Sequence, residues 1–283
     1  MFSRICKFVL IFVFSLSSIT GVSNAKVGPA SIHKITIFNE KASWTDAASA
    51  KKATDFIMKN VDSVSSEIKV YNDADIASFA KENTDDGNLD IIITFGYFPV
   101  SLYTPGNTQK EDSLAEQFLE GGDMFINTAD YIFYVTEGGG KNGENGLKTI
   151  TDSTFDMWGD GNSSKPTADG KKYTPSLKAF SNAQRPFKVD QIKADKNWEV
   201  EVVFGDNDGG GGSMADPIII RHKEHNGRVC IALQTGVPDP IEAIRGKVIH
   251  EIIDNYLKLN VIAIDPVAKI AAAWGDIKKG SIK

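Results

Sequence analysis

The chain contains little cysteine and little histidine, and this scarcity excludes several classes of protein. Two cysteines, Cys6 and Cys230, occur among its 283 residues. Cys6 lies in a leader that we expect to be removed, so Cys230 would remain alone and no intrachain disulfide can form. The four histidines are scattered. His222 and His225 have no third ligand at a spacing typical of zinc sites, so we expect a solvated hairpin there.

A basic surface and a membrane-spanning segment are also lacking. The formal net charge is −6, from 31 basic and 37 acidic residues without a basic stripe. Removal of Arg4 and Lys7 with the leader makes it −8. We therefore expect neither nucleic acid nor an anionic membrane as a partner.

Residues 1–25 have the features of a secretory signal peptide. Two basic residues precede the apolar run Phe8–Leu16, and small residues occupy Ser23–Ala25. Serines interrupt the run well before the roughly 20 apolar residues that a membrane span needs. We expect cleavage after Ala25 and export to the periplasm or the cell exterior, with no membrane attachment afterwards.

One central stretch predicts a strand, a helix and a second strand. Leu89–Phe95 is apolar and rich in β-branched residues, which is typical of a strand buried on both faces of a parallel sheet. Ser113 and Glu116 have the spacing of a capping box, and Gly121 follows the helix. Met124–Asn127 is apolar again. A unit of this length is most simply a right-handed parallel crossover.

The remaining segments repeat this alternation of strand and helix. The expected elements are strands at 32–38, 68–71 and 198–204, helices at 45–61 and 73–80, a hairpin of 217–221 and 228–233, and a helix from Asp239 to Tyr256. The order is typical of a flavodoxin-like, doubly wound α/β fold with a mostly parallel sheet, a C-terminal β-hairpin and a closing helix.

Three divisions of the chain follow after the signal peptide. We expect an α/β domain over residues 26–260, a Gly-rich insertion within it at about 136–197, and a C-terminal tail over 261–283. Within the insertion, residues 155–174 give no pattern typical of helix or strand.

The pattern from Leu89 to Tyr131 resembles the class I glutamine amidotransferase-like superfamily, and within it the ThuA-like (trehalose utilisation) group. The hairpin residues Asn226–Val229 and the helix with Arg245 and Asn255 also fit the closing elements of that group. The resemblance covers roughly Ile32 to Leu259 and implies a flavodoxin-like fold.

The chain departs from this family at the residues that carry its chemistry. Amidotransferases of this class place a nucleophilic Cys at a sharp turn after a central strand, whereas no Cys occurs here between Lys26 and Val229. Cys230 falls within a predicted strand, where a thiol is usually inert. We therefore expect no glutamine amidotransferase activity. Many ThuA-like chains have a His shortly before an Asp after the Gly-rich helix end, and this chain has Asn127 and Asp130.

Polar and aromatic residues follow the predicted parallel strands, where ligands bind in open α/β sheets. The ligand-binding candidates are Tyr97, Phe98, Asn127, Thr128 and Tyr134. Aromatic rings stack on the apolar face of a sugar, and amides and hydroxyls bind its hydroxyl groups. We expect a small carbohydrate or polyol as ligand. The alternative is that the aromatic residues pack beneath a loop.

Whether the chain is an enzyme stays open at this point. Asp130 and Glu40 are the candidate general acid or base of a hydrolase or isomerase acting on a sugar derivative, and a helix or turn cap is the simpler role for Asp130. A third hypothesis is a cell-surface interaction module that uses the Gly-rich loops.

No cofactor is expected, because no phosphate-binding glycine motif opens a helix. Asp206 and Asp208 are weak calcium candidates, since Pro217 stands where an EF-hand loop needs Glu.

Overall fold

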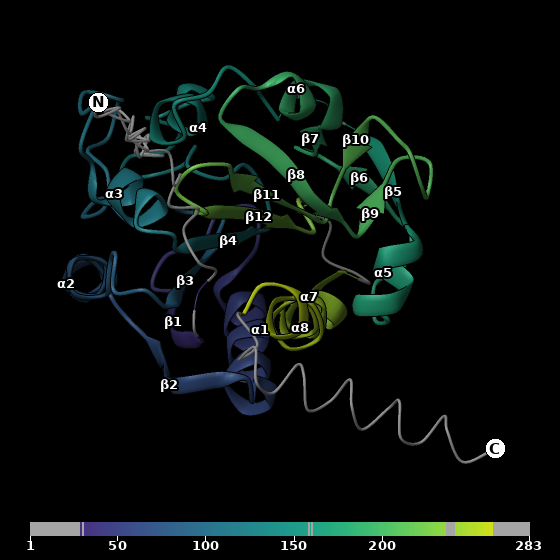
Figure 1. Ribbon diagram of the computed structural model, residues 1–283, viewed down its shortest axis with the longest axis horizontal. Coiled ribbons are helices and arrows are strands. Elements are labelled where there is room, and N and C mark those ends of the chain that lie inside the picture. Colours follow the sequence, from purple (N-terminus) through teal and green to yellow (C-terminus); the bar gives the residue numbers. More distant parts are fainter. Residues whose placement is uncertain (1–28, 30, 158, 160, 236–240, 263–283) are drawn as a thin grey trace, which may run out of the picture.

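A seven-stranded, mostly parallel sheet forms the centre of the protein. The computed structural model describes residues 29, 31–157, 159, 161–235 and 241–262. The strand order of this sheet is β2-β1-β3-β4-β12-β11-β8 (Figure 1). The strands are β1 (Ile32–Phe38), β2 (Val64–Val70), β3 (Leu89–Phe95), β4 (Met124–Thr128), β8 (Trp198–Val203), β11 (Ile218–His222) and β12 (Arg228–Ala232). β11 is antiparallel to both neighbours, and the other pairs are parallel. The predicted flavodoxin-like α/β class is confirmed.

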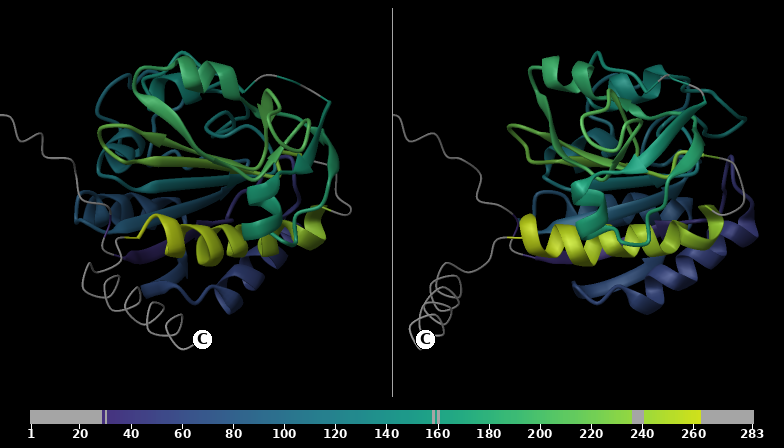
Figure 2. Two further views of the ribbon diagram at one scale, coloured as in Figure 1. Left: turned by 45° about the vertical axis from the view of Figure 1, so that its right-hand side comes forward. Right: turned by 90° about the vertical axis from the view of Figure 1, so that its right-hand side faces the viewer.

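Helices cover both faces of this sheet, as a doubly wound fold requires. α1 (Ala47–Asn60) and α7 (Ile241–Glu251) lie side by side on one face (Figure 2). α2 (Asp73–Asn83) and α3 (Leu114–Glu120) pack together on the other. α7 continues through a π-helical segment, Ile252–Leu257, into α8 (Lys258–Asn260).

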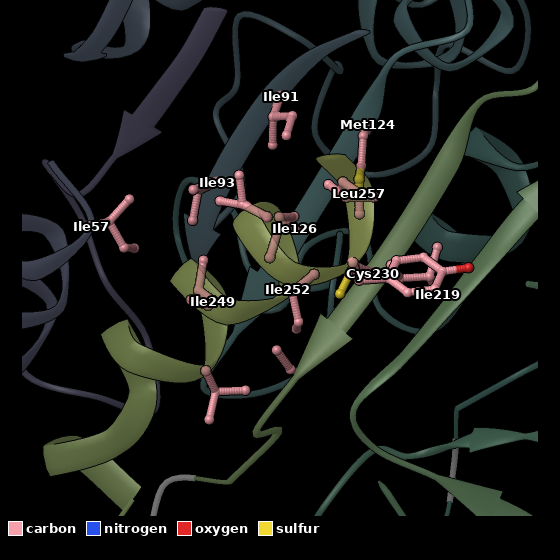
Figure 3. Close-up of a cluster of buried hydrophobic side chains, with 14 of the residues drawn as sticks. Ile57, Ile91, Ile93, Met124, Ile126, Ile219, Cys230, Ile249, Ile252 and Leu257 are labelled. Atoms are coloured by element: carbon pink, nitrogen blue, oxygen red, sulfur yellow. The ribbon is translucent and has the colours of Figure 1, made fainter. Parts of the chain in front are cut away.

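Every residue of β3 is buried, because successive side chains enter two different cores. Ile91 and Ile93 pack with Ile57 of α1 and Ile249 of α7 (Figure 3). Ile92 packs with the aromatic residues of the opposite face. This confirms the strand predicted from the apolar run.

Residues 136–197, predicted as an insertion, contribute to a second, five-stranded sheet. Its order is β6-β5-β9-β10-β7. The elements of residues 136–197 are α4 (Asn145–Ile150), β5 (Asn162–Pro166), α5 (Ala168–Tyr173), β6 (Phe180–Ala183), β7 (Phe187–Lys188) and α6 (Val189–Ala194), and the same sheet contains β9 (Gly205–Asp206) and β10 (Met214–Ala215). β9 and β10 come from beyond residue 197. The region without a clear pattern contains β5 and α5, which are too short for a helical or strand period to show.

The hairpin of β11 and β12 forms as predicted. The pair Asn226-Gly227 is typical of a tight turn with positive φ at both residues, and Asn226 has a φ of 63°, whereas Gly227 does not have a positive φ. Gly227 is instead required by close packing, since a Cβ there would lie 1.9 Å from the Leu119 carbonyl oxygen.

Some predicted features lie outside the described residues. These are the signal peptide, the helix start at Asp239 and Pro240, and nearly all of the tail. Within the described part of the chain, no helix is long and apolar enough to cross a membrane.

Candidate functional site

The loops that follow β1, β3 and β4 meet at the carboxyl edge of the sheet, where the sequence places the ligand site. The Ser43 N–H donates to the Phe95 carbonyl at 2.9 Å, and the Phe98 N–H donates to the Val135 carbonyl at 2.8 Å. Gly96 is tightly enclosed: a Cβ there would lie 2.2 Å from the Ser43 carbonyl oxygen. The three loops are therefore tied together by backbone contacts.

Asn127, at the end of β4, joins these loops through hydrogen bonds of its side-chain amide. Its Oδ1 accepts from the Thr94 hydroxyl at 2.9 Å and from the Gly96 N–H at 3.2 Å. Its Nδ2 donates to the Asp130 carbonyl at 3.2 Å and to Gln234 Oε1 at 3.4 Å. The hydrogen-bonding capacity of this buried amide is thus filled by the protein.

Thr128 and Phe98 also have buried structural contacts. The Thr128 hydroxyl accepts a hydrogen bond from the Arg245 guanidinium. Phe98 is 1% exposed and packs edge-to-face on Phe125 and Phe133, with ring centroids 5.6 and 4.8 Å away. Both side chains are therefore held by contacts within the protein.

Asp130 is a buried carboxyl group with an unsatisfied oxygen. Its side chain is 3% exposed, and Oδ1 accepts no hydrogen bond from the described residues. Burial raises the pKa of Asp130 to about 6, although the charge of Arg185 and the Tyr131 N–H lower it. A buried acceptor without a donor is rare in proteins and is costly.

The backbone around Asp130 is strained. The φ values of Ala129, Tyr131 and Phe133 are 85°, 39° and 64°. Residues other than glycine rarely adopt this left-handed region. Each such residue costs about 1–2 kcal/mol. Strain of this kind is concentrated at functional sites, so the loop after β4 is a site candidate on conformational grounds as well.

An aromatic patch, defined here as Trp44, Tyr131 and Tyr134, lies next to Asp130. The Tyr131 and Tyr134 ring centroids are 4.2 Å apart, and Trp44 is 6.0 Å from Tyr134. Trp44 is 38% exposed. The Arg185 guanidinium lies 4.9 Å from the Tyr131 centroid. The patch therefore exposes part of the Trp44 indole to solvent, while its buried ring, Tyr131, lies under Arg185 and directly follows Asp130 in the chain.

Tyr97 and Glu40 lie at the same edge, but their contacts differ from those of Asp130. The Tyr97 ring is 6.1 Å from that of Phe38 and lies under the Lys41 ammonium group, which is 5.3 Å from its centroid. Glu40 accepts from the Asp73 N–H at the start of α2, at 3.0 Å. Among the described residues, the hydrogen bond of Glu40 is to α2 and not to the Asp130 cluster.

Asp216 is a second buried carboxyl group, which the sequence did not indicate. It is fully buried, and its oxygens accept from the Leu233 and Gln234 N–H groups at 2.7 and 2.6 Å. Burial, with a smaller contribution from the charge of Asp130, raises its pKa to about 7, although the Gln234 and Leu233 N–H groups and the charge of Arg245 lower it. The sequence feature that could have drawn attention to Asp216 is its position directly before Pro217, at the start of a predicted strand.

Arg245 supports the same region from α7. It is 1% exposed and donates to the Leu233 and Thr235 carbonyls at 3.1 and 3.2 Å. Asp216 and Arg245 together fix the segment after β12, which carries the Gln234 partner of Asn127. The candidate site therefore rests on a rigid buried polar layer.

The calcium candidate Asp206 has its carboxylate surrounded by backbone donors. Its oxygens accept from the N–H groups of Asp208, Gly210, Gly211 and Gly212 at 2.9–3.0 Å, and also from Gly209. Burial raises its pKa, but these donors lower it overall. A calcium ion would have to displace these N–H groups, and Asp208 is exposed on the same loop.

The two hairpin histidines stack and do not form a metal site. Their ring centroids are 4.6 Å apart. His222 Nδ1 accepts from the N–H groups of Glu224 and His225, so a neutral ring carries its proton on Nε2 and cannot ligate a metal through that atom. Burial lowers the pKa of His222 to about 4.

The solved structures that are similar to this chain include two with low TM-scores. No family model and no curated protein matches the chain. A protein from Bacteroides uniformis described as ThuA-like has a TM-score of 0.46 and 13% identity, over 87% of this chain and 97% of that one. A cytoplasmic protein from Salmonella typhimurium has a TM-score of 0.41 and 7% identity, over 78% and 98%. Because both scores are below 0.5, we draw no conclusion about activity from them.

Proposed function

We propose that this chain binds a small carbohydrate or polyol at the carboxyl edge of the sheet, with Asp130 as hydrogen-bond acceptor and the aromatic patch as stacking surface. The observation that carries the proposal is the buried Oδ1 of Asp130, which has no donor among the described residues. A ligand hydroxyl would supply that donor and offset part of the cost of burying the oxygen.

The aromatic patch supports a ring-shaped, hydroxylated ligand. Trp44 and Tyr134 offer apolar ring faces that match the C–H face of a sugar. Near neutral pH the carboxyl group of Asp130 is mostly ionised, because its pKa of about 6 lies below 7. A carboxylate accepts hydrogen bonds from neutral hydroxyl groups and repels anions, so a neutral polyol fits better than a phosphate or sulfate.

Binding fits the described carboxyl groups better than turnover does. Hydrolysis of a glycosidic bond commonly uses two carboxyl groups on opposite sides of the bond. Asp216 is enclosed by backbone amides, and Glu40 is bound to α2, so neither is placed to work with Asp130. The raised pKa of Asp130 is the observation that favours the second candidate function, a hydrolase or isomerase acting on a sugar derivative.

The export predicted from residues 1–25 belongs to the same proposal. A secreted or periplasmic binding domain would meet free sugars outside the cell. The third hypothesis, an interaction module, becomes the better one if no small ligand is found.

The test is a thermal-shift screen of the purified chain against neutral sugars, polyols and sugar acids. A ligand that binds only the folded state raises the melting temperature. We expect a selective shift with one class of neutral sugar or polyol, which Asp130→Asn and Trp44→Ala abolish and the surface control Asp55→Asn retains. A shift that survives both site variants contradicts this site. Conversion of the sugar during incubation would support the enzyme.

A further inference from the structure

At the opposite, amino edge of the sheet, three side chains from β1, β3 and the loop before β3 converge. His33 Nδ1 lies 3.4 Å from Asp86 Oδ2 and 3.6 Å from Asp90 Oδ1. One ligand atom from each residue lies within 4.8 Å of the other two. This cluster is remote in the fold from Asp130, so it is independent of the proposed sugar site.

A β-bulge in β1 creates the convergence. Ile32 pairs with Leu89 and Ile35 pairs with Ile91, so two residues of β1 oppose the single Asp90 of β3. Bulges of this type turn a side chain out of its regular alternation. Here the bulge contains His33, and it brings the imidazole to the side where Asp90 lies.

Asp90 is completely buried, and its own N–H donates to Asp123 Oδ1 at 2.9 Å. The Lys34 N–H faces its carboxyl group without making a hydrogen bond of normal geometry to it. Asp90 is 0% exposed, and neither carboxyl oxygen accepts a hydrogen bond of normal geometry from any described residue. The Lys34 ammonium group donates instead to Asn83 Oδ1 at 2.7 Å. Asp216 is equally buried, yet both of its oxygens have backbone donors. Asp90 thus leaves both carboxyl oxygens without a hydrogen bond of normal geometry from the described residues, whereas Asp130 leaves one.

A simple ion pair does not account for these distances. A charge-assisted N–H···O bond between imidazolium and carboxylate is about 2.7–2.9 Å long. The two Nδ1···O distances are 3.4 and 3.6 Å, and Nδ1 makes no hydrogen bond within the described residues. Metal–ligand bonds of about 2.0–2.2 Å in a tetrahedral site place neighbouring ligand atoms about 3.3–3.6 Å apart.

We propose that His33, Asp86 and Asp90 bind one divalent transition-metal ion, for which Zn²⁺ is the probe. The donor set is one imidazole nitrogen and two carboxylate oxygens, which suits zinc and its neighbours in the first transition series. Asp86 is prepared for this role, because its Oδ1 accepts the Asn88 N–H at 2.8 Å and leaves Oδ2 directed towards His33.

The site is open to solvent on one side. The side chains of His33 and Asp86 are 28% and 27% exposed, so an ion can enter and a water molecule can take the fourth position. A bound ion would connect β1 to β3 and to the loop before β3. We infer that it stabilises the amino edge of the sheet and takes no part in ligand binding at the other edge.

The experiment measures Zn²⁺ binding to the full chain after removal of metal with a chelator. Isothermal titration calorimetry gives the affinity and stoichiometry for the parent, for His33→Gln and for Asp90→Asn. His225→Gln is the matched control, because His225 is also half-buried, next to a carboxylate and outside the cluster. Circular dichroism checks that each variant is folded, and His33→Gln tests the site at a partly exposed position if Asp90→Asn does not fold.

We expect one Zn²⁺ per chain in the parent and in His225→Gln. Loss of a residue that only orients a ligand costs about 10–100-fold in metal affinity, so loss of a ligand should cost about 100-fold or more. Zn²⁺ should also raise the melting temperature of the parent and not that of the two site variants. Absence of Zn²⁺ binding in the parent, or unchanged affinity in either site variant, overturns the proposal.

Discussion

Replacing Asp130 by Asn should make the ligand-free chain more stable at pH 8 while abolishing the proposed sugar binding. The folded chain raises the pKa of this carboxyl group from 3.8 to about 6. One pKa unit corresponds to about 1.4 kcal/mol, so the buried carboxylate costs about 3 kcal/mol relative to the unfolded chain. Asn is neutral and nearly the same shape, and it removes this cost.

The effect should depend on pH in a defined direction. Because the pKa of Asp130 is raised in the folded state, the folded chain binds a proton more tightly than the unfolded chain between pH 3.8 and about 6. Stability from this group is present below pH 3.8 and is lost as the pH rises through about 6. The variant should therefore match the parent near pH 4 and exceed it by up to about 3 kcal/mol at pH 8.

Urea denaturation at pH 4 and pH 8 measures the difference. The control is Asp55→Asn, an exposed carboxyl group paired with Lys51, which should change stability by less than about 0.5 kcal/mol at either pH. A variant that is less stable than the parent at pH 8, or that differs equally at both pH values, would refute the reasoning. Such a result would show that Asp130 is a structural cap.

Two further substitutions and one measurement of thiol reactivity test other parts of the structure. Asp206→Asn should lower stability by about 2 kcal/mol at pH 7 in denaturation experiments, because an amide cannot accept all the backbone donors of the loop. Since the pKa of Asp206 is lowered, its stabilisation is lost as the pH falls below 3.8, and the two chains should converge there. Asn127→Leu should cost about 3 kcal/mol by the same assay, because the Thr94 hydroxyl and the Gly96 N–H lose their acceptor; an unchanged midpoint would disprove the bridging role. The Cys230 thiol is fully buried, which raises its pKa, so it should react with a thiol reagent only in urea; reaction in the native chain would contradict the burial.

The polar residues of the candidate site show what a sequence pattern can and cannot assign. Position after a strand correctly brought Tyr97, Asn127 and Asp130 to one edge of the sheet. It did not separate Asn127, whose side chain makes four hydrogen bonds within the protein, from Asp130, one of whose oxygens has no donor in the described part of the chain. Whether such a side chain is satisfied depends on hydrogen-bond partners from other strands, and these partners cannot be identified from its position along the chain.

What the sequence determined by itself was local. The buried strand Leu89–Phe95 follows from an unbroken apolar run, and the capping box of Ser113 and Glu116 forms with both reciprocal hydrogen bonds because its partners are three residues apart. The hairpin turn at Asn226 follows from the φ that this residue tolerates.

Only the tertiary structure decided the buried polar groups. Asp216 finds its donors 17 and 18 residues later, and Arg245 reaches Thr128 across 117 residues. His33 meets Asp90 because a bulge in one strand lies against the start of another. Whether a carboxyl group is charged, capped or left without a donor is set by desolvation and by partners from distant segments. For that reason the fold could be predicted from periodicity, whereas the chemistry of its sites required the packed structure.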